Sequence, residues 1–150
     1  MPIFVNETEI DDHTVFSEMQ YHSGDTMDEA RDAAAQALVV RELLRQEAVK
    51  RGLSRPEDAE DALDAALMAL IEAEVAVPPA NVDFCKTYYE QNKDRFRTSD
   101  ASNAYLPFEL AEEKIRDYLH TRSIREGIRS YVLNLAGNAR IAGFDLAGSL

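Results

Sequence analysis

The sequence contains one cysteine and no tryptophan, and histidine occurs three times in 150 residues. Because Cys85 has no second cysteine to pair with, no intrachain disulfide forms, and a domain of this length needs none. Cys85 also falls on a predicted core face, which favours a buried, inert thiol over a nucleophile. His13, His22 and His120 lie on different predicted elements, without the one-turn spacing that brings two imidazoles to one metal ion. We therefore predict no metal site, no catalytic residue and no cofactor.

Basic residues are scarce, since 16 Lys and Arg stand against 28 Asp and Glu and give a formal net charge of −12. This charge repels a phosphate backbone, so we predict no nucleic-acid partner. Long apolar runs are absent, because charges interrupt every apolar stretch, and the opening MPIFVNETEI has neither a basic leader nor an apolar signal segment. We expect a cytoplasmic protein with no membrane partner.

Glycine and proline are rare, with six and five residues, and no glycine-rich phosphate-binding motif is present. The abundance of Ala, Leu, Glu and Arg favours an all-α fold with two or more long helices. Thr26 with Glu29, and Ser54 with Glu57, have the capping-box spacing that starts a helix. Apolar spacing and stop signals predict helices over about 11–21, 26–51, 54–75, 81–92 and 107–135.

The two ends of the chain carry a weaker strand pattern. Ile3 and Val5 alternate with polar neighbours, which predicts a short strand or an extended arm. Ile141 lies in a short extended segment after a helix-stop signal, and this segment is a candidate partner for the N-terminal arm. A minor strand pair at the termini is therefore an expected addition to the helices.

The last long helix has a broad apolar stripe that only Arg122 interrupts. Because each long helix needs a partner for its apolar face, we expect Ile115, Leu119, Ile128 and Val132 to pack against the helices between residues 26 and 75.

Three segments carry a family resemblance: QALVVRELLRQEAVKRGL, EVAVPPANVDFCKTYYEQNKDRFR and PFELAEEKIRDYLHTRSIREGIRSYVLNLAGNARIAG. In this order they resemble the parts that flank the catalytic domain of parvulin-type (PpiC/rotamase) peptidyl-prolyl cis-trans isomerases, in the NifM-like group related to SurA. The similarity runs from about residue 3 to residue 146, and the order of YYEQNKDRF and PFELAEEKIRDYL is its most specific part. In that family a catalytic domain of roughly one hundred residues, the length of a compact domain, stands between those two phrases. Here about ten residues replace it, through either an engineered or a natural deletion.

The resemblance implies a helical chaperone domain of the SurA and trigger-factor type, without the catalytic parvulin domain. It would form a single domain from an N-terminal part (1–97) and a C-terminal helix part (105–150), joined by a bridge (98–104). Because the family's catalytic residues have no counterpart here, the resemblance implies that this chain is not itself an isomerase.

The first functional hypothesis is an ATP-independent chaperone domain that holds unfolded or proline-containing polypeptide in an apolar cleft between helices. The alternatives are a helical dimerisation scaffold that presents isomerase domains, and a maturation factor dedicated to one metalloenzyme client, as the NifM resemblance implies. A homodimer is expected, with exchange of the first long helix or the C-terminal helix as one route to it. The candidate peptide-binding residues are Leu43, Met68, Ile71, Phe84, Tyr88, Tyr89 and Phe96.

Overall fold

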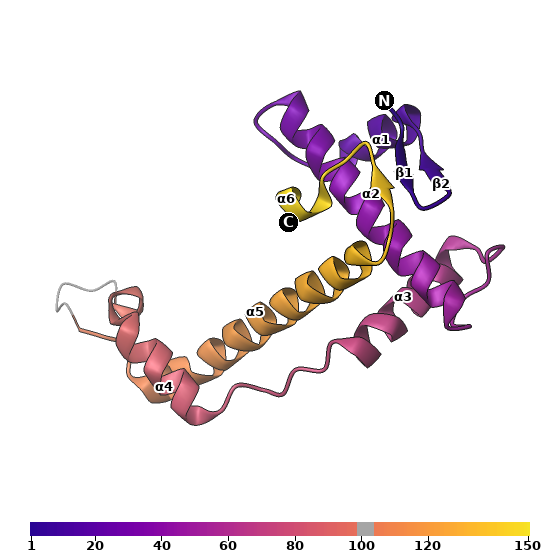
Figure 1. Cartoon of the computed structure of the whole chain (residues 1–150). Coiled ribbons are helices and arrows are strands. Elements are labelled where there is room, and N and C mark those ends of the chain that lie inside the picture. Colours follow the sequence, from indigo (N-terminus) through magenta and orange to yellow (C-terminus); the bar gives the residue numbers. More distant parts are fainter. Residues whose placement is uncertain (99–103) are drawn as a thin grey trace. The chain divides into compact units, whose positions relative to one another are not determined.

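The computed structural model describes residues 1–98 and 104–150 (Figure 1). Six α-helices, two short 3-10 helices and one small three-stranded sheet are present among these residues. The prediction of a predominantly helical fold with a minor strand pairing at the termini is confirmed. None of the helices in this part of the chain is both long and apolar enough to span a bilayer.

The described residues group into two compact units. The first unit consists of Met1–Val75 and Ile128–Leu150, and the second unit is Ala76–Gly127. The single domain expected from parts 1–97 and 105–150 stays a prediction. Most of its bridge, residues 99–103, lies outside the described residues.

A small antiparallel sheet brings the two ends of the chain together in the first unit. β1 (Ile3–Val5) pairs with β2 (Thr8–Ile10) on one side and with β3 (Ile141–Ala142) on the other. Asn6 makes the turn between β1 and β2 with a positive φ of 55°, a conformation that Asn tolerates better than most residues. The predicted pairing of Ile141 with the N-terminal arm is therefore correct.

Local capping signals set the starts of the first helices. Asp11 caps α1 (Asp12–Glu18), because its Oδ1 accepts a hydrogen bond of 2.7 Å from the Thr14 N–H. This bond is the main cause of the lowered pKa of Asp11. The 3-10 helix η1 (Met19–Tyr21) follows α1. Thr26 caps α2 (Met27–Lys50) in the same way through the Glu29 N–H at 3.1 Å, as the sequence predicts.

The main core of the first unit forms where α2, α1, the sheet and the C-terminal segment meet. The short helix α6 (Leu146–Ser149) contributes Leu146 to this core. A second cluster joins the end of α2 to α3 (Glu60–Glu74), with Leu70 fully buried. Small side chains on α2 allow its neighbours to approach closely. The buried residues of α2 are Ala34, Ala35, Val39, Leu43, Leu44 and Ala48.

The predicted start of the second long helix at Ser54 is wrong. The helix α3 begins at Glu60, and residue 57 plays no capping role. The Asp58 carboxylate accepts hydrogen bonds from the Ser54 hydroxyl at 3.1 Å and from the Arg55 N–H at 2.9 Å. The Ser54 hydroxyl is thus engaged with Asp58 and does not cap a helix, and the first helical residue lies five positions later than a cap at Ser54 would place it.

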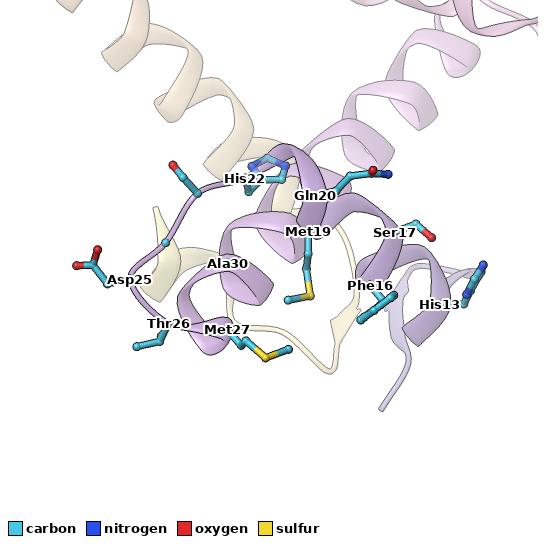
Figure 2. A pocket seen from close by; sticks show the side chains of 12 residues that line it. His13, Phe16, Ser17, Met19, Gln20, His22, Asp25, Thr26, Met27 and Ala30 are labelled. Carbon is cyan, nitrogen blue, oxygen red and sulfur yellow. The ribbon is translucent and has the colours of Figure 1, made fainter.

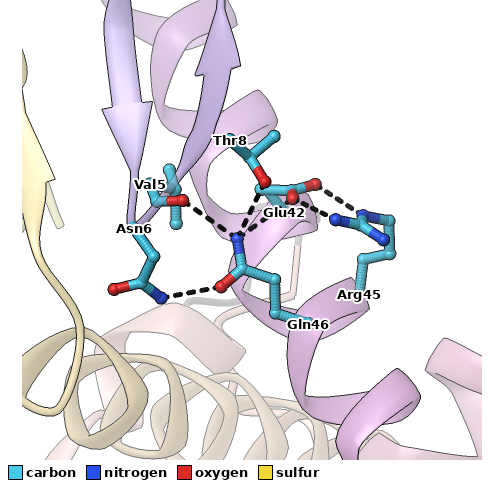
Figure 3. A network of polar contacts seen from close by, with 6 residues as sticks. All are labelled: Val5, Asn6, Thr8, Glu42, Arg45 and Gln46. Carbon is cyan, nitrogen blue, oxygen red and sulfur yellow. Dashed lines mark hydrogen bonds and ion pairs between the residues drawn. The ribbon is translucent and has the colours of Figure 1, made fainter. Parts of the chain in front are cut away.

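A polar network fastens the β1–β2 turn to α2 (Figure 3). Asn6 donates to the Gln46 Oε1 at 2.7 Å, and the Gln46 amide donates to the Val5 carbonyl at 3.0 Å and to Glu42 at 3.1 Å. Burial raises the pKa of Glu42, but the hydrogen bonds from Arg45 and Gln46 outweigh it, so the pKa lies below its usual value. Gln46 thereby holds the turn through both the Val5 backbone carbonyl and the Asn6 side chain.

The second unit contains α4 (Val82–Gln91), the 3-10 helix η2 (Lys93–Phe96) and the first part of α5 (Phe108–Gly137). Asn81 caps α4, and α5 begins directly after Pro107, so both helices start where the sequence predicts. The core of this unit consists of Cys85, Tyr89, Ala111, Ile115 and Leu119.

The predicted partner of the α5 stripe is correct for only half of its length. Val132 and Ile128 pack in the core that contains α2, as expected. Ile115 and Leu119 instead pack with α4 in the second unit. The apolar stripe of one helix therefore belongs to two separate cores.

Candidate functional site

Each unit contains a cavity large enough for several side chains of a ligand. The cavity of the first unit has a volume of about 740 Å³, and that of the second unit about 820 Å³. Both volumes fall within the usual range of ligand-binding clefts.

The cavity of the first unit lies between α1, η1 and the start of α2 (Figure 2). In this view the Met19 side chain points toward the side on which Phe16 and Met27 lie. His22 contributes its ring, and its Nε2 lies 3.1 Å from the Glu18 carboxylate. No residue predicted from the sequence to bind peptide lines this cavity.

The cleft of the second unit has three walls: the extended segment before α4, the helix α4 itself, and the middle of α5. The Asn81 side chain accepts a 2.9 Å hydrogen bond from the Phe84 N–H, which fixes the angle at which the extended segment enters α4. On the other side, the Arg116 guanidinium donates to the Ala80 carbonyl at 3.0 Å and ties the segment to α5. We call this site the aromatic cleft.

Aromatic rings in tilted and edge-to-face contact form part of the aromatic cleft and of the core next to it. The Tyr88 ring lies 5.4 Å from that of Tyr118, and 6.3 Å from that of Phe96 in an edge-to-face arrangement. The Tyr89 ring is buried, and its centroid lies 5.1 Å from that of Phe96. Its hydroxyl donates a hydrogen bond to the Leu106 carbonyl at 2.6 Å. Rings held in this way are positioned before a ligand arrives.

Several apolar groups of the aromatic cleft remain open to solvent. Phe84 is 66% exposed and Tyr118 is 46% exposed, although both rings would be more stable in an apolar environment. Pro78 and Pro79 are also exposed and line the same cleft. The site therefore offers aromatic and proline surfaces to an incoming chain.

The charges at the aromatic cleft have the opposite sign to the charge of the whole protein. Arg95 and Arg122 line it, and no Asp or Glu occurs among its described lining residues. The Arg95 guanidinium donates to the Tyr88 hydroxyl at 3.2 Å, and the Arg122 guanidinium lies 5.7 Å from the Tyr118 ring centroid. Neither arginine forms an ion pair with a carboxylate in the described part of the chain.

Arg97 shows how an arginine outside the cleft is paired. Its guanidinium lies 3.2 Å from the Asp94 carboxylate, and this hydrogen bond is the main reason that the pKa of Arg97 is raised.

The seven residues predicted to bind peptide fall in different environments. Phe84 and Tyr88 line the aromatic cleft, and Phe96 and Tyr89 support it from the core. In the first unit, Leu43 is buried in the main core and Ile71 packs against the α2–α3 cluster. Met68 is exposed on α3 and lines neither cavity. The structure thus brings Phe84, Tyr88, Tyr89 and Phe96 together in one unit.

Several lining residues of the aromatic cleft are not among those predicted from the sequence. Pro78, Pro79 and Tyr118 line the cleft and are absent from the predicted peptide-binding set. The available signal was Arg122, because a single cation within an apolar stripe marks a position that faces solvent.

Among residues 1–98 and 104–150, no group of three or more His, Cys, Asp or Glu side chains is placed to hold a metal ion. No family model, curated protein or solved structure matches the chain.

Proposed function

We propose that this protein is an ATP-independent polypeptide-binding module, the chaperone domain of a parvulin-type peptidyl-prolyl isomerase, and that the aromatic cleft holds the client chain. The observation that carries this proposal is the pair of exposed rings, Phe84 and Tyr118, beside two exposed prolines in a cleft of about 820 Å³. Unfolded and proline-containing segments are the clients that such a surface accommodates.

Burial of apolar surface supplies the binding energy. A client side chain that covers an exposed ring gains roughly 25 cal/mol for each Å² removed from water. Extended proline-rich segments dock readily on aromatic-lined grooves, because their backbone is already extended and loses little entropy. The cost of ordering a flexible client offsets part of this gain, so we expect weak to moderate affinity.

The chain on either side of residues 99–103 supports the relation to a protein with an inserted domain. The Leu106 N–H donates to the Phe96 carbonyl at 2.6 Å, and the Thr98 N–H donates to the Ala104 carbonyl at 2.8 Å. The chain therefore leaves and returns at neighbouring points, which is the geometry at which a domain can be inserted or removed without disrupting its host.

Suppression of aggregation tests this proposal. The full chain, at several-fold molar excess, should reduce the light scattering of two unrelated unfolding proteins. Phe84→Ala should weaken this effect, because it removes an exposed ring from the aromatic cleft. Phe16→Ala is a matched control, since Phe16 is also 66% exposed but lines the cavity of the first unit.

Tyr21→Ala supplies a second control, because Tyr21 is exposed and lines neither cavity. Equal activity of all three variants and the unchanged protein would remove the aromatic cleft from the proposal. If the folded, unchanged chain leaves both clients unaffected, the chaperone function itself is wrong.

A homodimeric scaffold, with or without exchange of a long helix, stays a prediction. Sedimentation equilibrium of the full chain across a hundredfold concentration range measures it directly. A monomer at every concentration would exclude the scaffold and leave the binding module intact.

A further inference from the structure

The described lining of the aromatic cleft contains two arginines and no Asp or Glu, in a protein with a net charge of −12. Some arginines of this chain have an acidic neighbour, as Arg97 has Asp94 and Arg41 has Asp64. Arg95 and Arg122 have none among the described residues. Their guanidinium groups are held beside tyrosines, where they keep free N–H donors.

A guanidinium group with free donors is suited to a carboxylate, which it binds through two parallel hydrogen bonds. The aromatic rings next to it are suited to an apolar or proline side chain of the same ligand. Both requirements are met by a peptide in which an acidic residue adjoins an apolar one.

We propose that the aromatic cleft prefers extended client segments in which Asp or Glu lies next to an aromatic or proline residue. This inference rests on the polypeptide-binding function proposed above and specifies the clients. The client's apolar side chain covers Phe84 and Tyr118, and its carboxylate pairs with Arg95 or Arg122. The partner is another polypeptide, selected by charge as well as by apolar surface.

The net negative charge of the protein acts against this preference for acidic peptides, so tighter binding of an acidic peptide cannot come from the overall charge. Acidic residues elsewhere on the surface repel an acidic peptide, but at physiological ionic strength their effect falls off over about 8 Å. Arginines that touch the ligand are screened far less. An acidic peptide can bind more tightly than a neutral one only if these local cations dominate.

Fluorescence anisotropy with three labelled peptides measures the preference. The peptides share the sequence Gly-Ser-Ala-Phe-X-Pro-Phe-Ala-Ser-Gly, have blocked termini, and carry Glu, Gln or Lys at X. We expect the Glu peptide to bind the full chain about three- to tenfold more tightly than the Gln peptide, since each exposed ion pair contributes modestly. The Lys peptide should bind least tightly, and 0.5 M salt should reduce the ratio between the Glu and Gln peptides.

Arginine variants identify the groups responsible. Arg95→Gln and Arg122→Gln should each lower the ratio, and the double variant should bring it close to one without weakening the Gln peptide. Arg125→Gln is the matched control, because Arg125 is exposed on the same helix as Arg122 and lies outside the cleft. It should leave the ratio unchanged.

Equal affinity for the Glu and Gln peptides, tightest binding of the Lys peptide, or a ratio that survives in the double variant would each overturn the inference while leaving polypeptide binding intact. Failure of all three peptides to bind would overturn both proposals. If the double variant converts a dimer into a monomer in sedimentation, the ligand of the cleft is a second copy of this chain, and the inference is also wrong.

Discussion

The contact between Gly143 and the N-terminus gives a sharp test of the first unit. Gly143 follows β3 with a φ of +84°, and a Cβ built on it would lie 2.6 Å from the Pro2 carbonyl oxygen. Gly52 has a similar φ of +76° at the end of α2, but a Cβ there meets no atom within 4 Å. The two glycines therefore share a backbone conformation and differ in their surroundings.

The expected cost of each substitution follows from this difference. Alanine in a left-handed conformation costs about 1–2 kcal/mol, and the lower entropy of the unfolded chain returns about 0.4–1 kcal/mol. Gly52→Ala should thus destabilise by about 1 kcal/mol. Gly143→Ala carries the same cost and also forces the β3 turn away from β1, which adds about 1–3 kcal/mol by analogy with overpacked sites.

Urea unfolding followed by circular dichroism at 222 nm measures both free energies of unfolding. We expect Gly143→Ala to lose at least 1 kcal/mol more than Gly52→Ala, with an unchanged denaturant slope. An equal or smaller loss for Gly143→Ala would mean that the C-terminal segment is not closely packed on β1.

Three further outcomes test other parts of the structure. Leu70→Ala should cost about 2–5 kcal/mol because Leu70 is fully buried, whereas Met68→Ala on the exposed face of α3 should change stability by less than about 0.5 kcal/mol in the same urea experiment. The pKa of Glu42 is lower in the folded state than in the unfolded state, where it is near 4.5. The ionised Glu42 therefore stabilises the fold fully above pH 4.5, and this stabilisation is lost as the pH falls through the folded pKa. Glu42→Gln should make the free energy of unfolding fall less steeply between about pH 5 and pH 3 in acid titration. Tyr89→Phe, which deletes the hydroxyl that donates to Leu106, should cost about 0.5–1.5 kcal/mol, and an unchanged melting curve would contradict that hydrogen bond.

The features that could be predicted from the sequence depend on neighbouring residues. Thr26 caps a helix as expected, and the helices predicted to start near residues 11 and 81 are capped by Asp11 and Asn81, because a cap requires only a short polar side chain and the N–H groups two or three residues later. Ser54 has the same spacing and fails, since Asp58 offers its neighbours a stronger acceptor. The cap pattern alone does not show which of two local hydrogen-bonding arrangements forms.

The network around Gln46 is an example of what the sequence does not reveal. Gln46 looks like an ordinary polar position on a long helix, yet it links three residues of the β1–β2 hairpin to α2. Its role depends on contacts across about forty positions of sequence, and no periodicity records such a contact.

The sequence predicts only some of the residues of the aromatic cleft, for a related reason. The stripe of α5 indicates which residues avoid water, but it does not indicate which helix covers them. The buried residues of the second unit end at Leu119, and those packed with α2 resume at Ile128. Arg122 lies in this interval, and it lines the cleft together with Ser123. The one cation that interrupts a long apolar stripe therefore marks both the change of partner and the wall of the candidate binding site.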